Sequence, residues 1–205
     1  MPSSAGSPRA VEGLGDTAGM SQDHFLKNQF LVAMPGMQDE TFNHTVSLLC
    51  EHNDKGAVAL VINRPTDLAL SAMLEQMGLS HDGIGDDPPI YWGGPVQPER
   101  GFVVHREPGG WESCLHVQDD LYITTSRDIL SAIGNGRGPR DYLVTLGYAG
   151  WSAGQLEDEI LHNSWLNTPV NGDVLFALPP RERWQAATRL LGVDVTQLTG
   201  AAGHA

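Results

Sequence analysis

The sequence has few cysteines and contains no long apolar run. Its 205 residues include two cysteines, Cys50 and Cys114, which disfavours a secreted domain held by a framework of disulfides. A transmembrane helix needs about 18 consecutive apolar residues, and no such stretch occurs. No apolar segment follows Arg9 either, so a secretory signal is not expected. Together these absences predict a cytoplasmic protein.

Basic residues are also scarce. The 12 Lys and Arg residues stand against 25 Asp and Glu residues, giving a formal net charge of −13. Nucleic acids and anionic membranes both attract cationic protein surfaces, so this balance disfavours direct binding to either. What the chain does have is 40% hydrophobic residues, 24 glycines and 13 prolines. This composition predicts a globular protein built from many short elements and turns.

Both ends of the chain are small and polar. We expect residues 1–20 to form a disordered tail, with Met20 as an alternative initiator to Met1. Residues 199–205 are expected to fray. No repeat and no linker interrupts the sequence between these ends, so residues 21–198 are predicted to form a single domain.

Apolar runs bounded by turn residues predict many strands with a few helices inserted irregularly. This order favours an α+β fold with a mixed sheet over a regular βα alternation. Ser126 is the expected N-cap of one helix, and Ser152 with Gln155 the expected capping box of another. The expected strands or extended segments are 29–34, 45–52, 57–63, 89–92, 101–106, 114–117, 121–125, 142–148, 165–170 and 173–176. The expected helices are 71–77, 127–133, 153–161 and 181–191.

Two Cys-x-His pairs are the first candidates for chemistry. Strict alternation along a strand would place Cys50 and His52 on one face, where an imidazolium lowers the pKa of a thiol. Cys50 is therefore a candidate reactive thiol, and a cysteine packed as a small hydrophobe is the alternative. Cys114 and His116 repeat the spacing. Two such pairs can bind zinc, but ligands within strands disfavour it, and we expect no metal or cofactor. A cytoplasmic setting likewise disfavours a disulfide between the two cysteines.

Polar side chains and tight turns at strand ends supply candidate binding groups. Pro65 forces an extended backbone on Arg64, whose guanidinium can clamp a carboxylate or phosphate; an internal salt bridge is the alternative. Gly93 and Gly94 can cradle an anion with backbone N–H groups, or simply form a structural turn. The full set of candidate binding residues is Asn63, Arg64, Gly93, Gly94, His105, Trp151 and Gln155.

The segment from Gly147 to Trp151, followed by an acid-rich helix, is the most distinctive local sequence motif. It is expected to form one wall of a pocket. Gln155 and Glu159 stand on one helix face because they are four residues apart, and Asn163 lies four residues further. Acids on this helix are candidate general acid–base groups, with a solvated helix face as the alternative.

A longer pattern links several blocks of the chain. The blocks are 30–35, 45–46, 50–53, 56–65, 93–96, 100–105, 147–151 and 155–157. In this order they resemble the bacterial YqgE/AlgH (UPF0301) family, and the resemblance extends over about residues 30–191. Ala59 stands where the family usually has glycine.

The resemblance implies a fold more definitely than a function. It implies a compact single domain whose mixed, mostly antiparallel sheet is partly closed like a barrel and flanked by about four helices. Some members are labelled as transcriptional regulators through an effect on exopolysaccharide production. This sequence has no recognition-helix pattern and no basic patch, so we expect any such effect to be indirect, through a protein or small-molecule partner whose identity stays open.

Three functional hypotheses follow. The favoured one is a non-enzymatic cytoplasmic regulatory or binding protein. The first alternative is a thiol-based redox sensor or thiol enzyme that uses Cys50 with His52. The second is a direct DNA-binding regulator, which the net charge of −13 disfavours.

Overall fold

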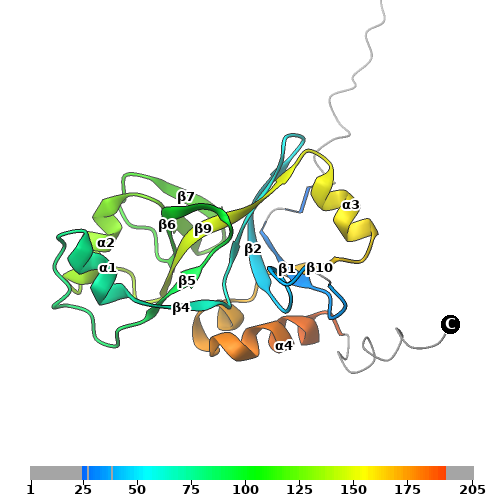
Figure 1. Ribbon diagram of the computed structural model, residues 1–205. Helices are drawn as coiled ribbons and strands as arrows, with labels where there is room; N and C mark the ends of the chain where they lie inside the picture. Colours follow the sequence, from blue (N-terminus) through cyan, green and yellow to red (C-terminus); the bar gives the residue numbers. More distant parts are fainter. Residues whose placement is uncertain (1–24, 27, 38, 193–205) are drawn as a thin grey trace, which may run out of the picture.

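The frame of the protein is a mixed sheet of ten strands that curls into a half-barrel (Figure 1). The computed structural model describes residues 25–26, 28–37 and 39–192. The strands are Gln29–Ala33 (β1), Val46–Asn53 (β2), Gly56–Val61 (β3), Pro65–Ala69 (β4), Pro89–Trp92 (β5), Val96–Arg106 (β6), Cys114–Gln118 (β7), Leu121–Thr124 (β8), Tyr142–Ser152 (β9) and Trp165–Pro169 (β10).

The strand order is β10-β1-β2-β3-β9-β6-β8-β7, and β5 joins β9 with β4 beside it. The pairing of β5 with β9 is parallel, whereas the other described pairings are antiparallel. The long strand β9 crosses the molecule and links its two halves (Figure 1). Its first part pairs with β5 and β6, and its last part pairs with β3.

Helices cover both halves of the sheet. They are Leu70–Gln76 (α1), Arg127–Gly134 (α2), Gln155–Leu161 (α3) and Pro180–Leu190 (α4), with a π-helical turn at Asp173–Ala177 (η1). The pair α1 and α2 closes one end, α3 packs near β9 and β10, and α4 lies against β1 and β2 (Figure 1). No helix in the described part of the chain combines the length and apolar character needed to cross a bilayer.

Alternating side chains along the strands divide the core into clusters on the two faces of the sheet. In β2, Leu48 packs with Phe30 and Leu60 in the cluster that reaches α4, whereas Leu49 packs with Leu156 of α3. A third cluster lies beneath α1 and α2. Full burial of each such leucine or phenylalanine contributes about 1.5–3 kcal/mol, so these clusters fix the helices onto the sheet.

The structure confirms the predicted single α+β domain with a curled, mostly antiparallel sheet. Its described residues form five helical segments, where about four were expected. The prediction of an extended 173–176 segment is wrong. Asn171 Oδ1 accepts the N–H groups of Asp173 (3.0 Å) and Val174 (3.2 Å) and starts the π-helical turn instead. The strand at Pro65–Ala69 was not expected, although proline is tolerated as the first residue of a strand. The predicted tails, 1–20 and 199–205, lie outside the described residues.

The two helix caps are only partly as expected. Ser126 occupies the N-cap position of α2, but its hydroxyl donates to Asp128 at 2.5 Å and makes no capping bond to the helix backbone. The N-cap of α3 is Gly154, with φ of +77°. Half of the capping box survives, because Gln155 Oε1 accepts the backbone N–H of Ser152 at 3.1 Å.

Candidate ligand-binding site

A cavity of about 670 Å³ opens beside α3. The loop after β1, the end of β9, the helix α3 and the start of β10 form its walls. Three aromatic side chains line it, namely Phe42, Trp151 and Trp165. Its polar groups include Gln155 and Glu159, so the predicted pocket wall at Trp151 and Gln155 lies where a cavity exists.

The aromatic rings contact one another in tilted and edge-to-face arrangements. The ring centroids of Phe42 and Trp165 are 5.7 Å apart with an interplanar angle of 68°. Those of Trp151 and Trp165 are 5.8 Å apart at 82°, and those of Phe42 and Trp151 are 6.4 Å apart. Such pairs are favourable beyond the apolar area that they bury. The rings therefore hold each other in place although they come from three separate segments.

Glu159 is the polar centre of the site. Its Oε2 accepts the indole N–H groups of Trp151 and Trp165, both at 2.8 Å. Its Oε1 accepts the side-chain N–H of Gln155 at 2.9 Å, which the spacing of four residues on α3 makes possible. One carboxylate thus fixes the orientation of both indoles at the cavity wall.

Sequence reasoning found part of this site. Trp151, Gln155 and Glu159 were singled out because they are close in the chain, and Asn163, on the same expected helix face, also lines the cavity. The sequence did not predict that Phe42 and Trp165 would join Trp151 at one cavity, because no local spacing connects the three residues. A tryptophan one turn beyond an acid-rich helix was the available signal for Trp165.

The prediction that Cys50 and His52 share a face is wrong. A β-bulge interrupts the pairing of β2 between Leu49 and Glu51, so the alternation assumed from the sequence breaks at Cys50. The Cys50 thiol packs against the cluster that reaches α4 and donates to the carbonyl of Leu48 at 3.2 Å. Burial, reinforced by the charge of Glu51, raises the pKa of Cys50 to about 12, which is the opposite of activation.

His52 turns toward α3 instead. Its Nδ1 accepts the backbone N–H of Leu26 at 2.8 Å, so the ring proton is on Nε2, which donates to Glu157 Oε1 at 2.9 Å. The imidazole is fully buried in this position. It ties β2 to α3 and does not serve the thiol.

The four residues considered for zinc do not come together. Cys50 and Cys114 are free thiols that line a second cavity of about 460 Å³. His52 is committed to α3, and His116 Nε2 pairs with the carbonyl of Asp119 at 2.9 Å. Within residues 25–26, 28–37 and 39–192, no group of three or more His, Cys, Asp or Glu side chains is arranged to hold a metal ion.

Asn63 and Arg64 hold the loop that precedes β2. Asn63 Nδ2 donates to the carbonyl of His44 at 2.9 Å. Arg64 donates to several carbonyls of the same loop, including that of Asn43 at 3.0 Å, and its guanidinium lies 5.5 Å from the Trp92 ring centroid. The guanidinium therefore binds backbone carbonyls, and it forms neither of the two contacts expected from the sequence, a salt bridge or a ligand clamp. These residues position the loop and leave few donors for a ligand.

Gly93 and Gly94 serve a close backbone crossing. The N–H of Gly93 donates to the carbonyl of Leu146 at 2.7 Å. A Cβ at Gly94 would lie 2.0 Å from the carbonyl carbon of Tyr148, and one at Gly93 would lie 2.2 Å from the carbonyl oxygen of Gly147. The glycines therefore let the two backbone segments cross closely, which is the role that the structural-turn alternative assigns to them.

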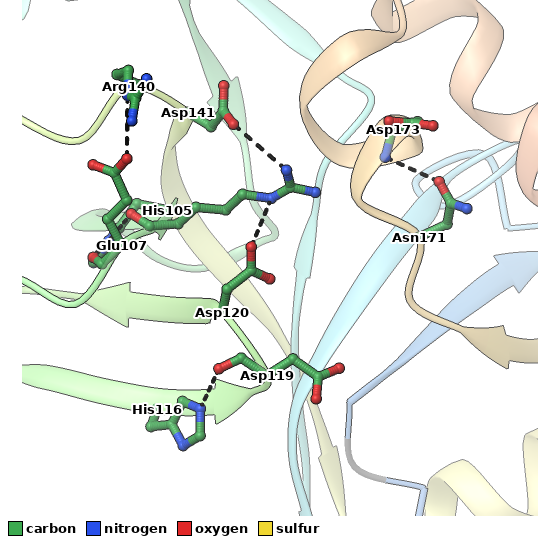
Figure 2. A network of polar contacts seen from close by, with 10 residues as sticks. His105, Glu107, His116, Asp119, Asp120, Arg140, Asp141, Asn171 and Asp173 are labelled. Carbon is green, nitrogen blue, oxygen red and sulfur yellow. Dashed lines mark hydrogen bonds and ion pairs between the residues drawn. The ribbon is translucent and has the colours of Figure 1, made fainter.

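His105 lies apart from the cavity, in the other half of the molecule. Its Nε2 pairs with Thr124 Oγ1 at 2.9 Å, and its Nδ1 faces the carbonyls of Arg106 and Glu107 (Figure 2). Burial lowers the pKa of His105. Next to it, the Arg106 guanidinium lies 3.4 Å from an oxygen of Asp120. Figure 2 shows this network together with Asn171 and Asp173, which lie where the chain enters η1.

Fold and cavity together define an α+β half-barrel protein with an aromatic, acid-containing cavity beside α3. Solved structures share this architecture. The solution structure of the AlgH protein from Pseudomonas aeruginosa aligns with a TM-score of 0.71 at 48% identity and covers 90% of this chain and 98% of that one. The crystal structure of DIP2367 from Corynebacterium diphtheriae aligns with a TM-score of 0.68 at 19% identity over 84% of this chain and 91% of that one, which shows the fold alone.

Sequence comparison gives the family. An AlgH-like family model matches residues 30–196. A UPF0301 protein from Thioalkalivibrio sulfidiphilus is 54% identical over 91% of this chain and all of its own length. One from Methylococcus capsulatus is 52% identical over 90% of this chain and 98% of its own. The chain belongs to the AlgH-like family, which confirms the resemblance drawn from its sequence blocks.

Proposed function

We propose that this protein is a non-enzymatic, cytoplasmic binding protein whose ligand enters the cavity beside α3. The observation that carries the proposal is the Glu159 carboxylate, which receives hydrogen bonds from Trp151, Trp165 and Gln155. Binding sites are typically concave, largely apolar and preformed, with a few fixed polar groups. An aromatic wall locked by one carboxylate meets this description.

The contacts and pKa shifts of the titratable groups favour a binding function over a catalytic one. Both oxygens of Glu159 already accept hydrogen bonds, so it is poorly placed to shuttle a proton. Burial raises the pKa of Cys50 to about 12 and lowers that of His105, and both side chains lie outside the cavity lining. Cys50 and Glu159, two of the groups that the sequence offered for a thiol or acid–base mechanism, are thus held by structural contacts.

Any effect on transcription is then an indirect one. The net charge of −13 opposes contact with a phosphate backbone, and the cavity offers a way to couple a small molecule to a protein partner. A gel-shift assay at low salt, with no shift expected, separates this mode of action from direct DNA binding.

Ligand-dependent stabilisation tests the proposal. We would screen metabolites and nucleotides by thermal shift and tryptophan fluorescence, since a ligand at 100 times its Kd stabilises a protein by about 2.7 kcal/mol. Trp151→Phe keeps a ring at the cavity but removes its N–H, and it should weaken every hit. Trp184→Phe is the matched control, because its indole donates to the carbonyl of Ala33 at 2.9 Å and it does not line the cavity.

Two outcomes would contradict the proposal. One is a set of hits whose affinity is the same in Trp151→Phe and in wild type, because the ligand would then sit elsewhere. The other is steady conversion of a screened compound that disappears when one cavity side chain, such as Glu159, is replaced.

A further inference from the structure

We infer that the cavity beside α3 is built for an organic cation carried on a compact apolar body, of the alkylated ammonium class. This inference rests on the proposed function and names the chemistry of its ligand. It draws on three features of the cavity: the sign of its charge, the unused acceptor capacity of Glu159, and the aromatic wall.

The charges that face the cavity have one sign. Asp39 and Glu159 line it, and no lysine or arginine is among its described lining residues. Neither carboxylate takes part in any ion pair between the residues that the structure describes. Arg64 lies between β3 and β4, where its guanidinium donates to carbonyls of the loop that carries Asp39 and interacts with the charge of Asp39. His162 also lines the cavity, but its Nδ1 pairs with the carbonyl of Asp158 at 2.7 Å. The cavity therefore disfavours anions.

The hydrogen bonds to Glu159 hold its oxygens without neutralising them. A carboxylate has about four acceptor positions, and Trp151, Trp165 and Gln155 occupy three. All three donors are neutral N–H groups, so the negative charge keeps no counter-charge of its own. A cation in the cavity would supply that charge, whereas a neutral apolar ligand would leave it uncompensated.

The aromatic wall selects the kind of cation. Ring faces of tryptophan and phenylalanine attract cations within about 6 Å of the centroid, and they suit diffuse alkylammonium charges. The thioethers of Met34 and Met37 add an apolar, adaptable surface on the loop opposite. A small hydrated metal ion would find too few oxygen ligands here, because the described residues contain no group of three or more His, Cys, Asp or Glu side chains that could hold it.

The test compares choline with its neutral isostere 3,3-dimethylbutan-1-ol, using isothermal titration calorimetry on the full chain. The two compounds have the same shape and differ in charge. We expect choline to bind, and the alcohol to bind about tenfold more weakly or not at all. Glu159→Gln and Asp39→Asn should each weaken choline binding and leave the affinity for the alcohol nearly unchanged. Asp39→Asn leaves the Glu159 network intact, so it keeps the test decisive if Glu159→Gln disturbs the fold.

Glu157→Gln is the matched control. It removes one negative charge from the same helix, but Glu157 pairs with His52 and does not line the cavity. Equal loss of choline affinity in this control would mean that bulk charge, not the cavity, attracts the cation, and would overturn the inference. Equal or tighter binding of the alcohol would overturn it while leaving the cavity as a binding site. If neither compound binds, the ammonium assignment is wrong, and the metabolite screen alone then decides the proposed function.

Discussion

Removal of the Glu159 carboxylate is the perturbation that tests the site most directly. In Glu159→Ala, the indole N–H groups of Trp151 and Trp165 and the amide of Gln155 all lose their acceptor. Trp151 is 8% exposed and Trp165 is 2% exposed, so their donors have little access to bulk water. The substitution therefore strands two nearly buried donors at once.

The expected cost follows from these two donors. A buried polar group left unsatisfied costs about 1–3 kcal/mol, so two such groups give about 2–6 kcal/mol of lost unfolding free energy. The neighbouring cavity admits water, which places the expected value in the lower half of this range. In Glu159→Gln an amide oxygen remains to accept both indole N–H groups, so this variant should lose less.

Urea unfolding followed by circular dichroism measures this loss. Trp151→Phe should cost less in the Glu159→Ala background than in the native one, because the donor that it removes is already unsatisfied there. The coupling energy of this double-mutant cycle isolates the bond between Trp151 and Glu159. A loss below about 0.5 kcal/mol for Glu159→Ala, with no coupling, would show that the carboxylate does not hold the indoles.

Three further predictions concern residues outside the cavity. A disulfide reagent such as Ellman's should modify the exposed Cys114 in the native protein and spare the half-buried Cys50, whose pKa is raised to about 12; rapid modification of both would contradict the raised pKa. Gly147→Ala should destabilise by about 2–4 kcal/mol, since φ is +74° and a Cβ would lie 2.3 Å from a carbonyl oxygen; Gly85→Ala, with open space around it, should be nearly neutral. Burial lowers the pKa of His105 below its usual 6.5, so the unfolded chain binds the proton more readily and stability should fall as pH drops through 6.5. His105→Gln should flatten that pH dependence of the urea midpoint, and an unchanged profile would contradict the assignment.

Elements with local signals were predictable from the sequence. The hairpin of β2 and β3 follows from the turn at Asn53–Gly56, and the helix α4 follows from Pro180 in its first turn and from Gly192, whose φ is +68°. Each of these signals acts within a few residues. The fold class depends only on their order along the chain, which explains why it was also predictable.

The bulge in β2 was not predictable in the same way. It adds one residue between Leu49 and Glu51, and the extra residue is defined only by the register with β3. Because side chains alternate with a period of two, that one residue separated His52 from Cys50 and removed the thiol hypothesis. Whether two residues share a strand face therefore depends on the register with the partner strand, which the local sequence does not determine.

The candidate site likewise has one part that local spacing predicts and one part that depends on long-range contacts. Gln155 and Glu159 could be paired from their spacing, but Phe42 and Trp165 reach Trp151 only when the loop after β1 and the strand β10 fold against the end of β9. Long-range closure of this kind leaves no trace in local spacing.

The polar motifs at strand ends explain how that closure is enforced. Asn63 and Arg64 were expected to contact a ligand, yet their side chains bind the backbone of the loop that carries Phe42. They are positioning residues, because replacing either would release the loop and with it one ring of the cavity wall. The conspicuous polar motifs thus act one step away from the cavity. The cavity wall itself is made by Trp151, which the sequence singled out, together with Phe42 and Trp165, which no local pattern connects to it.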